Sequence, residues 1–456
     1  MTQQMKEAPI LRWPEAKKAP AVVLPAAGVE RRSWQRAAIW LVVAAFAVRM
    51  AFLLGLQTYS YDRIDDVSRF NETTYIAQWI AEGRGFSSPF GVQVYTGPTA
   101  WIPPVHPYLC ALVFRGLGSL SQRSFLVILT LQSLFSALTI IPMFGIASRT
   151  VGYRAGLWAA IGWAFFPWFS KWAVTWVYET TMSTLLVGLL LWYALYLAET
   201  SSRKAWIGFG ALWGFALLVN PALLTLWVLS LAWCGYVKGK GQWLKPAIIS
   251  LVTCLLVTSP WMVRNRLVLG HWVFVRSNFG AEFALGNYHG SLGRGESVGR
   301  HPTTSPVEFQ NYQQMGDVGY NRWKAQQALR FIRDYPWEFV SLTAKRVVYF
   351  WDGSGMAYRP PTAWYWLPWS FLPLSLLAMP VLGMALRRRV YAWQLFWGAF
   401  LLYPAPYYLV FSLVRYRHVL EPLLLLLVAY AAVEILGRRL PSWGPERMAG
   451  VPQHLG

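Results

Sequence analysis

The chain has 456 residues, of which 55% are hydrophobic, 16% are aromatic and only 13% are charged. A soluble protein of this length carries about twice that charged fraction, and the apolar residues come in blocks of roughly 20, long enough to cross the hydrocarbon of a bilayer. The composition therefore predicts a polytopic membrane protein. The net charge of +21 does not indicate nucleic-acid binding, because the basic residues lie in short connections between apolar blocks, where they orient a membrane protein.

Residues 1–33 are rich in Ala, Pro and Lys and show no periodicity, so we expect a disordered cytoplasmic tail. Roughly ten transmembrane helices should follow in an all-α fold. Within one block that is too long for a single span, Asn220 and Pro221 predict a tight turn, because proline cannot continue the hydrogen-bond ladder of a helix. The predicted spans cover residues 34–56, 125–148, 155–170, 175–197, 205–219, 221–237, 245–263, 363–386, 392–414 and 418–436.

The distribution of basic residues predicts the orientation of these spans. With the N-terminus inside, the short internal loops hold ten Lys and Arg residues and the short external turns hold three. Both termini are then cytoplasmic, the C-terminal tail being residues 438–456, and two longer segments face outward. The first outer loop is 57–123, within the transmembrane part 34–268, and the second is 269–358, before the C-terminal helices of 359–437.

Each outward segment carries local structure of its own. In the first, residues 70–82 have helical apolar spacing and predict an amphipathic interfacial helix, and 105–117 predict a second apolar helix too short to span. The second is a small segment of mixed character. Its start, "HWVFVRSNFG", alternates like a strand, and residues 323–351 predict two helices broken at Pro336, with Asp334 as a cap.

Carboxylates gather at the outer boundary of the membrane instead of mid-bilayer, where a transporter would place them. No GxxxxGK[ST] or GxGxxG motif is present, so no nucleotide site is visible. Chemistry on the outer face needs an activated donor that is already in the membrane, and a lipid-linked phosphate sugar fits this need. The carboxylates are Asp62, Asp65, Asp66, Glu72 and Glu82.

Glycosyl transfer from a lipid phosphate requires a carboxylate base for the acceptor hydroxyl and cations for the departing phosphate. Arginine suits the second role because it binds phosphate in bidentate fashion. Arg49, inside the first span, is a further candidate, because intramembrane charges are often functional. The other candidate cations are Arg415 and Arg417 in "VRYRHVLEP", together with Lys345 and Arg346.

Three stretches resemble a known group of enzymes: "NETTYIAQWIAEGRGFSSPFG…TGPTAWIPPVHPYL", "PWMVRNRLVLGHWVFVRSNFGAEFALGN" and "RYRHVLEPLLLLLVAY". They are similar to the polytopic glycosyltransferases of the GT-C superfamily. This superfamily includes the dolichyl-phosphate-mannose protein mannosyltransferases, the aminoarabinose transferase of lipid A and the rhizobial lipopolysaccharide galacturonosyltransferases. The resemblance implies an inverting transferase that uses a polyprenyl-phosphate sugar and takes its catalytic acidic residue from the first outer loop.

Such relatives often begin the amphipathic helix with an Asp-Glu pair in which Asp is the base, whereas this chain has Asn71 and Glu72. Because Asn cannot accept a proton usefully, the base is Glu72 or one of Asp65 and Asp66. We favour Glu72 because it lies in the motif.

Weaker candidates for the acceptor or sugar are Glu179, His106 and Asn287, each of which also has a structural interpretation. The three cysteines suggest neither a disulfide framework nor a metal site. A divalent ion could help the phosphate leave, but only the loop acids offer ligands for one.

The sequence therefore predicts a glycosyltransferase of the bacterial cytoplasmic (inner) membrane with its active site on the outer face. Two alternatives remain. One is an O-antigen-ligase-like enzyme that moves a whole glycan, and the other is a flippase or transporter of lipid-linked sugars.

Overall fold

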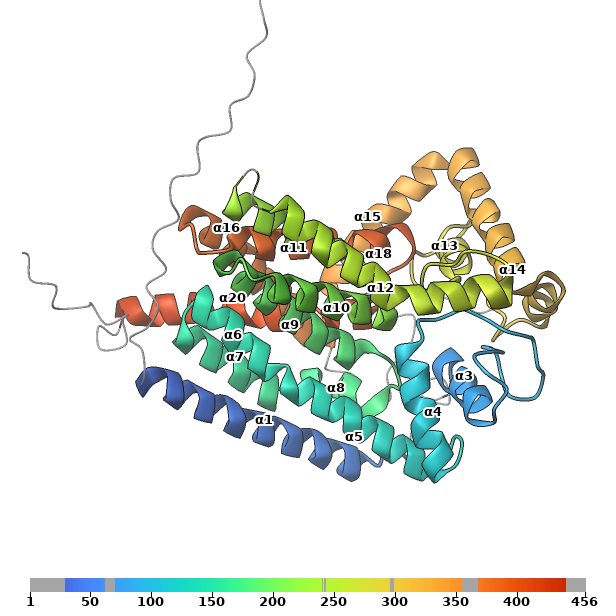
Figure 1. Ribbon diagram of the computed structural model, residues 1–456, viewed down its shortest axis with the longest axis horizontal. Helices are drawn as coiled ribbons and strands as arrows, with labels where there is room; N and C mark the ends of the chain where they lie inside the picture. Colours follow the sequence, from blue (N-terminus) through green and yellow to red (C-terminus); the bar gives the residue numbers. More distant parts are fainter. Residues whose placement is uncertain are drawn as a thin grey trace, which may run out of the picture.

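The computed structural model describes residues 29–61, 70–239, 241, 243–295, 299–354 and 368–439. In these residues the chain is helical and has no strand, apart from two isolated bridges that join Ser87 to Pro98 and Arg294 to Ser412. Most helices run side by side in one elongated bundle (Figure 1). The predicted all-α polytopic fold is confirmed. Predictions for residues 1–28 and 440–456 lie outside the described residues, as do those for Asp62, Asp65 and Asp66.

The helices of the bundle follow the apolar blocks of the sequence. Proline and the Asn220 turn divide several blocks: Pro221 starts the 3-10 helix η1 (Pro221–Leu223), while Asn220 accepts a hydrogen bond from the Ala222 N–H. The bundle comprises α1 (Val29–Leu56), α5 (Gln122–Leu138), α6 (Ile140–Arg149), α7 (Tyr153–Phe165), α8 (Pro167–Thr175), α9 (Thr180–Glu199), α10 (Arg203–Val219), α11 (Leu224–Lys238), α12 (Leu244–Leu269), α16 (Pro368–Arg387), α17 (Trp393–Leu402), α18 (Ala405–Leu409), α19 (Val414–His418) and α20 (Glu421–Arg439).

Five helical segments within the described residues are long and apolar enough to cross a membrane: Gln35–Leu56, Gln122–Arg149, Thr180–Glu199, Pro221–Lys238 and Leu244–Leu269. The predicted number of about ten is therefore not confirmed. The physical reason is that several apolar blocks are broken. Residues 155–170, for example, are divided between α7 and α8 where Pro167 begins a new helix.

The helices outside the bundle gather at one of its ends, on the right of Figure 1. They are α3 (Glu72–Ala81), α4 (Val105–Leu117), α13 (Phe279–Gly286), α14 (Pro306–Asp334) and α15 (Pro336–Asp352). The start of α1 and the end of α20 lie at the opposite end (Figure 1). Which end faces the cytoplasm stays a prediction.

The two interfacial helices of the first loop form where the sequence predicts them. Helices α3 and α4 pack on each other, and their apolar faces share a core with α5. Among the buried residues of this core are Ile76, Ile80, Phe114 and Phe125. The loop is therefore folded against the bundle, because its apolar residues are buried there.

Two local predictions for the second outer segment are wrong. Residues 271–278 form no strand, because their backbone carbonyls are satisfied by side chains of α12: Trp261 Nε1 donates to Val275 O and Asn265 Nδ2 donates to Val273 O. Asp334 is not a helix cap. It is the last residue of α14 and pairs with Arg333, and α15 begins after Tyr335 without a side-chain cap.

A buried carboxylate joins the two outer segments. Asp317 of α14 accepts hydrogen bonds from the Ala100 N–H at 2.6 Å, the Thr99 hydroxyl at 3.0 Å and the Ser277 hydroxyl at 2.7 Å. Beside it, Trp101 packs among aromatic residues of α14 in a small separate core. These contacts hold the first outer loop against α14, next to the position of Glu72.

Candidate active site

The position of Glu72 is set by the start of α3. Asn71 is the N-cap: its side-chain oxygen accepts from the backbone N–H groups of Thr73 at 3.0 Å and Thr74 at 3.4 Å, and the Thr74 hydroxyl completes a capping box. Asn is as good an N-cap as Asp. The Asn that replaces the expected Asp therefore has a structural function here, and it places Glu72 as the first residue of the helix.

Glu72 is partly shielded from water, with 21% of its side chain exposed, and its Oε1 lies 3.6 Å from His301 Nε2. Burial raises the pKa of the Glu72 carboxyl, the positive charge of Arg415 acts to lower it, and the negative charge of Glu179 acts to raise it. Two residues predicted for the site, Arg415 and Glu179, are thus close enough to Glu72 to act on its charge.

Arg415 lies on α19, where its Cζ is 3.8 Å from the centre of the Tyr178 ring and 5.2 Å from that of Tyr416. Its Nη1 is buried and has no hydrogen-bond partner among the described residues. A guanidinium with an unused buried donor is suited to bind an anion. Glu179 is the N-cap residue of α9, but its side chain makes no capping hydrogen bond to that helix.

Two further titratable residues near Glu72 are absent from the sequence predictions, Glu282 and His301. Together with Glu72, Arg415 and Glu179 they form the Glu72 cluster. Burial raises the pKa of Glu282 on α13, while Arg276 and His301 act to lower it. Burial lowers the pKa of His301 to about 4, so its imidazole is neutral at pH 7. Glu282 lies in the "NFGAEFALGN" stretch that carries the family resemblance, which was the available signal. His301 stands in a loop without any motif.

Helix α13 is held close to its neighbours by glycine. A Cβ at Gly280 would lie 1.9 Å from the carbonyl oxygen of Asn321 on α14, and one at Gly286 would lie 1.7 Å from that of Val410. Only glycine fits at both points. The close approach at both points fixes the position of α13, and Glu282 lies between them in the sequence.

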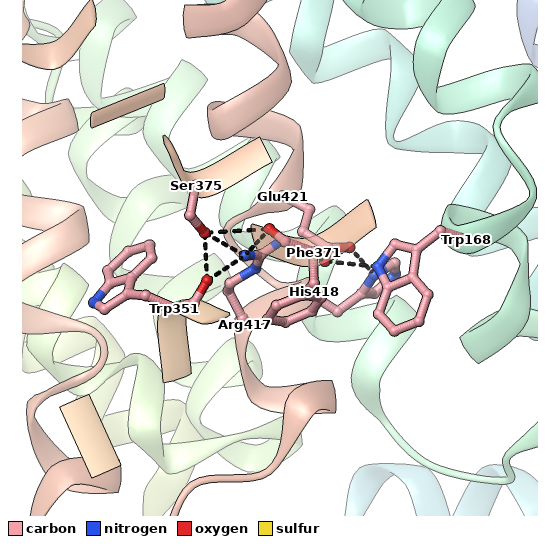
Figure 2. Close-up of polar contacts among 7 residues, drawn as sticks. All are labelled: Trp168, Trp351, Phe371, Ser375, Arg417, His418 and Glu421. Carbon is pink, nitrogen blue, oxygen red and sulfur yellow. Dashed lines mark hydrogen bonds and ion pairs between the residues drawn. The ribbon is translucent and has the colours of Figure 1, made fainter. Parts of the chain in front are cut away.

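Arg417, two residues beyond Arg415, lies in a different environment. It is fully buried, and its Nη1 donates to the carbonyls of Trp351 at 3.1 Å and Phe371 at 2.9 Å (Figure 2). Its Nη2 lies 3.4 Å from the Glu421 carboxylate. We therefore leave Arg417 out of the proposed site, because these bonds inside the bundle occupy its guanidinium.

Glu421 is the centre of this enclosed cluster. Its Oε1 accepts from Trp168 Nε1 at 2.9 Å, and its Oε2 lies 2.5 Å from His418 Nδ1. Ser375 contributes a hydroxyl 2.5 Å from Arg417 Nη1. The cluster links α8, α15, α16, α19 and α20. Figure 2 shows the seven residues that take part.

The remaining predicted cations are also separate from Glu72. Arg346 is buried and donates to the carbonyls of Tyr408, Leu409 and Gly286. Lys345 is exposed on α15. Arg49 is buried and donates to Ser136 and to three backbone carbonyls in or next to its span.

Two of the weaker candidates for the acceptor or sugar, Asn287 and His106, have different surroundings. Asn287 is buried, accepts from Arg346 and donates to Phe283 O and Leu409 O, so its amide holds the backbone. His106 is buried on α4 close enough to Glu179 for an electrostatic interaction. Among the described residues, no group of three or more His, Cys, Asp and Glu side chains could hold a metal ion.

Comparison with known proteins shows which families and folds the chain resembles. Residues 102–263 match the family model of the dolichyl-phosphate-mannose-protein mannosyltransferases. The fold is similar to that of the Archaeoglobus fulgidus oligosaccharyltransferase AglB, solved with an inhibitory peptide and a dolichol-phosphate, with a TM-score of 0.52 and 14% identity over 94% of this chain and 53% of that one. The resemblance to GT-C glycosyltransferases is confirmed. This chain spans about half the length of AglB.

Another similar structure is ArnT from Cupriavidus metallidurans. Its apo form has a TM-score of 0.47 and 16% identity over 91% of this chain and 62% of that one. Its complex with undecaprenyl phosphate has a TM-score of 0.38 and 14% identity over 90% of this chain and 80% of that one. No curated protein sequence matches the chain.

Proposed function

We propose that the protein is an integral-membrane glycosyltransferase that moves a sugar from a polyprenyl-phosphate donor to an acceptor hydroxyl. The observation that carries the proposal is the partly shielded carboxyl of Glu72, which is acted on by Arg415, a cation with an unused buried donor. The family match over residues 102–263 supports it, as does a fold similar to that of AglB, which was solved with a dolichol-phosphate.

In the proposed reaction the acceptor oxygen attacks the anomeric carbon of the donor sugar while Glu72 takes the hydroxyl proton. The bond between the anomeric carbon and the phosphate oxygen breaks on the opposite face, so the configuration inverts. The electron pair leaves with the polyprenyl phosphate, and Arg415 stabilises the charge that develops there through its free Nη1. The raised pKa of Glu72 suits a base, because a more basic carboxylate accepts the proton more readily.

The other charged residues of the cluster adjust Glu72. The negative charge of Glu179 raises the pKa of Glu72. His301, neutral at pH 7, lies beside the Glu72 carboxyl without cancelling its charge. Asp65 and Asp66 stay alternative bases.

We place the active site on the outer face of a bacterial cytoplasmic membrane, with both termini in the cytoplasm. The excess of basic residues in alternate short loops supports this orientation. Helices α3 and α13, which carry Glu72 and Glu282, also lie at the end of the bundle opposite to the start of α1 and the end of α20 (Figure 1). An outer site explains why the donor is a membrane lipid.

The surroundings of the buried charges favour the transferase over the transport alternative. Arg49, Arg417 and Glu421 are each fully buried and hydrogen-bonded to neighbouring helices. Charges that line a transport pathway are expected to face a water-filled cavity. These residues hold helices together instead.

The proposal is tested by reconstituting the protein in liposomes with a panel of radiolabelled polyprenyl-phosphate sugars. Glu72→Gln should lower kcat by about 10²–10⁴-fold, the usual contribution of a positioned base. The matched control is Glu82→Gln at the other end of α3, where the exposed Glu82 accepts from Gln78 Nε2. The base assignment is wrong if Glu72→Gln keeps full turnover. If the parent protein transfers sugar from none of the lipid phosphates, the function itself is wrong.

A further inference from the structure

A second feature lies beside α13, the helix that carries Glu282. A cavity of about 250 Å³ opens between the end of α13, the segment that follows it and the second half of α14. Ala284 and Leu285 of α13 line it, whereas Glu282 of the same helix acts on the charge of Glu72. The cavity and the charged residues around Glu72 therefore share α13.

The cavity has aromatic walls. Tyr288, Phe331 and Tyr335 all line it, and the rings of Phe331 and Tyr335 lie 5.8 Å apart at an angle of 30°. Aromatic rings with a polar tip suit ligands that are apolar on one face and wet on the other, as sugar rings are. The volume is below the roughly 300–1,000 Å³ of pockets for drug-sized ligands, so a single sugar residue is a suitable occupant.

Among the described residues, one cation of the cavity has no carboxylate partner. Lys324 lines it but is paired with Glu308 at 2.8 Å, and Asp334 lines it but is paired with Arg333 at 2.8 Å. Arg300 lines it with its Cζ 3.6 Å from the centre of the Tyr288 ring, and no carboxylate of the described residues forms an ion pair with it. Stacking leaves the guanidinium edge of Arg300 available for a bidentate bond to a carboxylate or phosphate.

We propose that this cavity is the acceptor site and that it binds a sugar residue carrying a carboxylate or a phosphate. Arg300, stacked on Tyr288, holds the anion, and the Tyr335 ring packs on the sugar. A neighbouring residue of the same acceptor then presents its hydroxyl to Glu72. The identification as an acceptor site rests on the proposed function, whereas the affinity for an anionic sugar does not.

Binding is measured first, without any donor, on the full-length protein in nanodiscs. The probes are three disaccharides with the same reducing end and a terminal glucuronic acid, glucose 6-phosphate or glucose. At least one anionic probe should bind about tenfold or more tightly than the neutral one, which is the effect expected of one hydrogen-bonded charge. The comparison of the two anionic probes separates carboxylate from phosphate recognition. Equal binding of all three would overturn the proposal.

Variants locate the site. Arg300→Gln should remove the advantage of the anionic probe, and Arg300→Lys should restore part of it. Tyr335→Leu should weaken all three probes by loss of stacking. The matched control is Arg322→Gln, because Arg322 is exposed on α14 and does not line the cavity. Unchanged anion binding in Arg300→Gln would place the site elsewhere.

Transfer assays then separate this proposal from the proposed function. Arg300→Gln should raise the KM for the acceptor at least tenfold and leave the KM for the donor unchanged. If transfer occurs and the acceptor KM does not change, the cavity is not the acceptor site and the transferase stands. If the anionic disaccharide binds through Arg300 but no lipid-linked sugar is ever transferred, the binding site stands and the transferase does not.

Discussion

The hydrogen bonds of Asp317 should hold the first outer loop closed over the site, and Asp317→Ala tests this. The carboxylate is 5% exposed and accepts from Ala100 N–H, Thr99 and Ser277. Alanine is the best helix former, so the substitution within α14 adds no backbone cost. Any loosening of the loop is then due to the lost acceptor.

The size of the effect follows from the number of bonds. Two of these bonds, from Ala100 and Thr99, join α14 to the first outer loop. At about 1.5–3 kcal/mol each they contribute up to about 6 kcal/mol, and the cost of burying the carboxylate offsets roughly half of that. Burial raises the pKa of Asp317, which is the sign of that cost. A net loss of about 3 kcal/mol raises the population of the open loop on the order of 100-fold.

Limited trypsin digestion measures this population, because trypsin needs the chain around its target residue to leave the folded structure before it can cut. The target is Arg84, whose guanidinium lies 5.0 Å from the Trp79 ring in the folded loop. At low protease, cleavage after Arg84 reports the open fraction, so Asp317→Ala in nanodiscs should be cut on the order of 100 times faster than the parent. Asp334→Ala is the control, because that carboxylate is exposed at the far end of α14. Equal cleavage of the three proteins would refute the role of Asp317.

Two other predictions follow. Burial raises the pKa of Glu72, and Glu72 must be deprotonated to act as the base. We therefore expect kcat/KM to fall at acid pH, with the midpoint of the fall at a pH above the ordinary pKa of glutamate. Arg415→Gln removes a positive charge that lowers the pKa of Glu72, so it should move this midpoint to a still higher pH. A pH–rate profile that does not move between the two proteins would contradict the assignment. Glu421→Gln leaves Arg417 buried without a counter-charge and should lower the free energy of unfolding by about 3–5 kcal/mol. The control is Glu199→Gln in an exposed ion pair, which should lower it by only about 0–1 kcal/mol. Denaturant titration in detergent measures both. Similar shifts for both variants would show that the buried pair is not needed for stability.

The helices of the first outer loop could be predicted from the sequence because local signals determine them. Apolar spacing predicted a helix over 70–82, and the structure has α3 at Glu72–Ala81, while 105–117 is the helix α4. The capping function of Asn71 was not predicted, because this position was interpreted only as the place where similar enzymes have the Asp that accepts the proton. Its capping bonds appear only once the helix start is known.

The partners of Glu72 were harder to predict. His301 and Glu282 come near it through the packing of α13 on α14, which depends on the close approach at Gly280. No periodicity encodes such a contact between segments so far apart in the chain. The alternation of apolar and polar residues at 271–280 predicted a strand. In the structure, side chains of α12 donate hydrogen bonds to this backbone, and no strand of the described residues pairs with it.

Helix α19 carries two arginines whose side chains have opposite surroundings. Turning this helix would break the bonds of Arg417 to Trp351, Phe371 and Ser375 together. Arg415 is therefore ordered before a donor lipid arrives, and donor affinity is spared the entropy of immobilising it. Natural variants with changes deep in the bundle, far from any reacting atom, would then differ in how tightly they hold the lipid while keeping the same pH dependence.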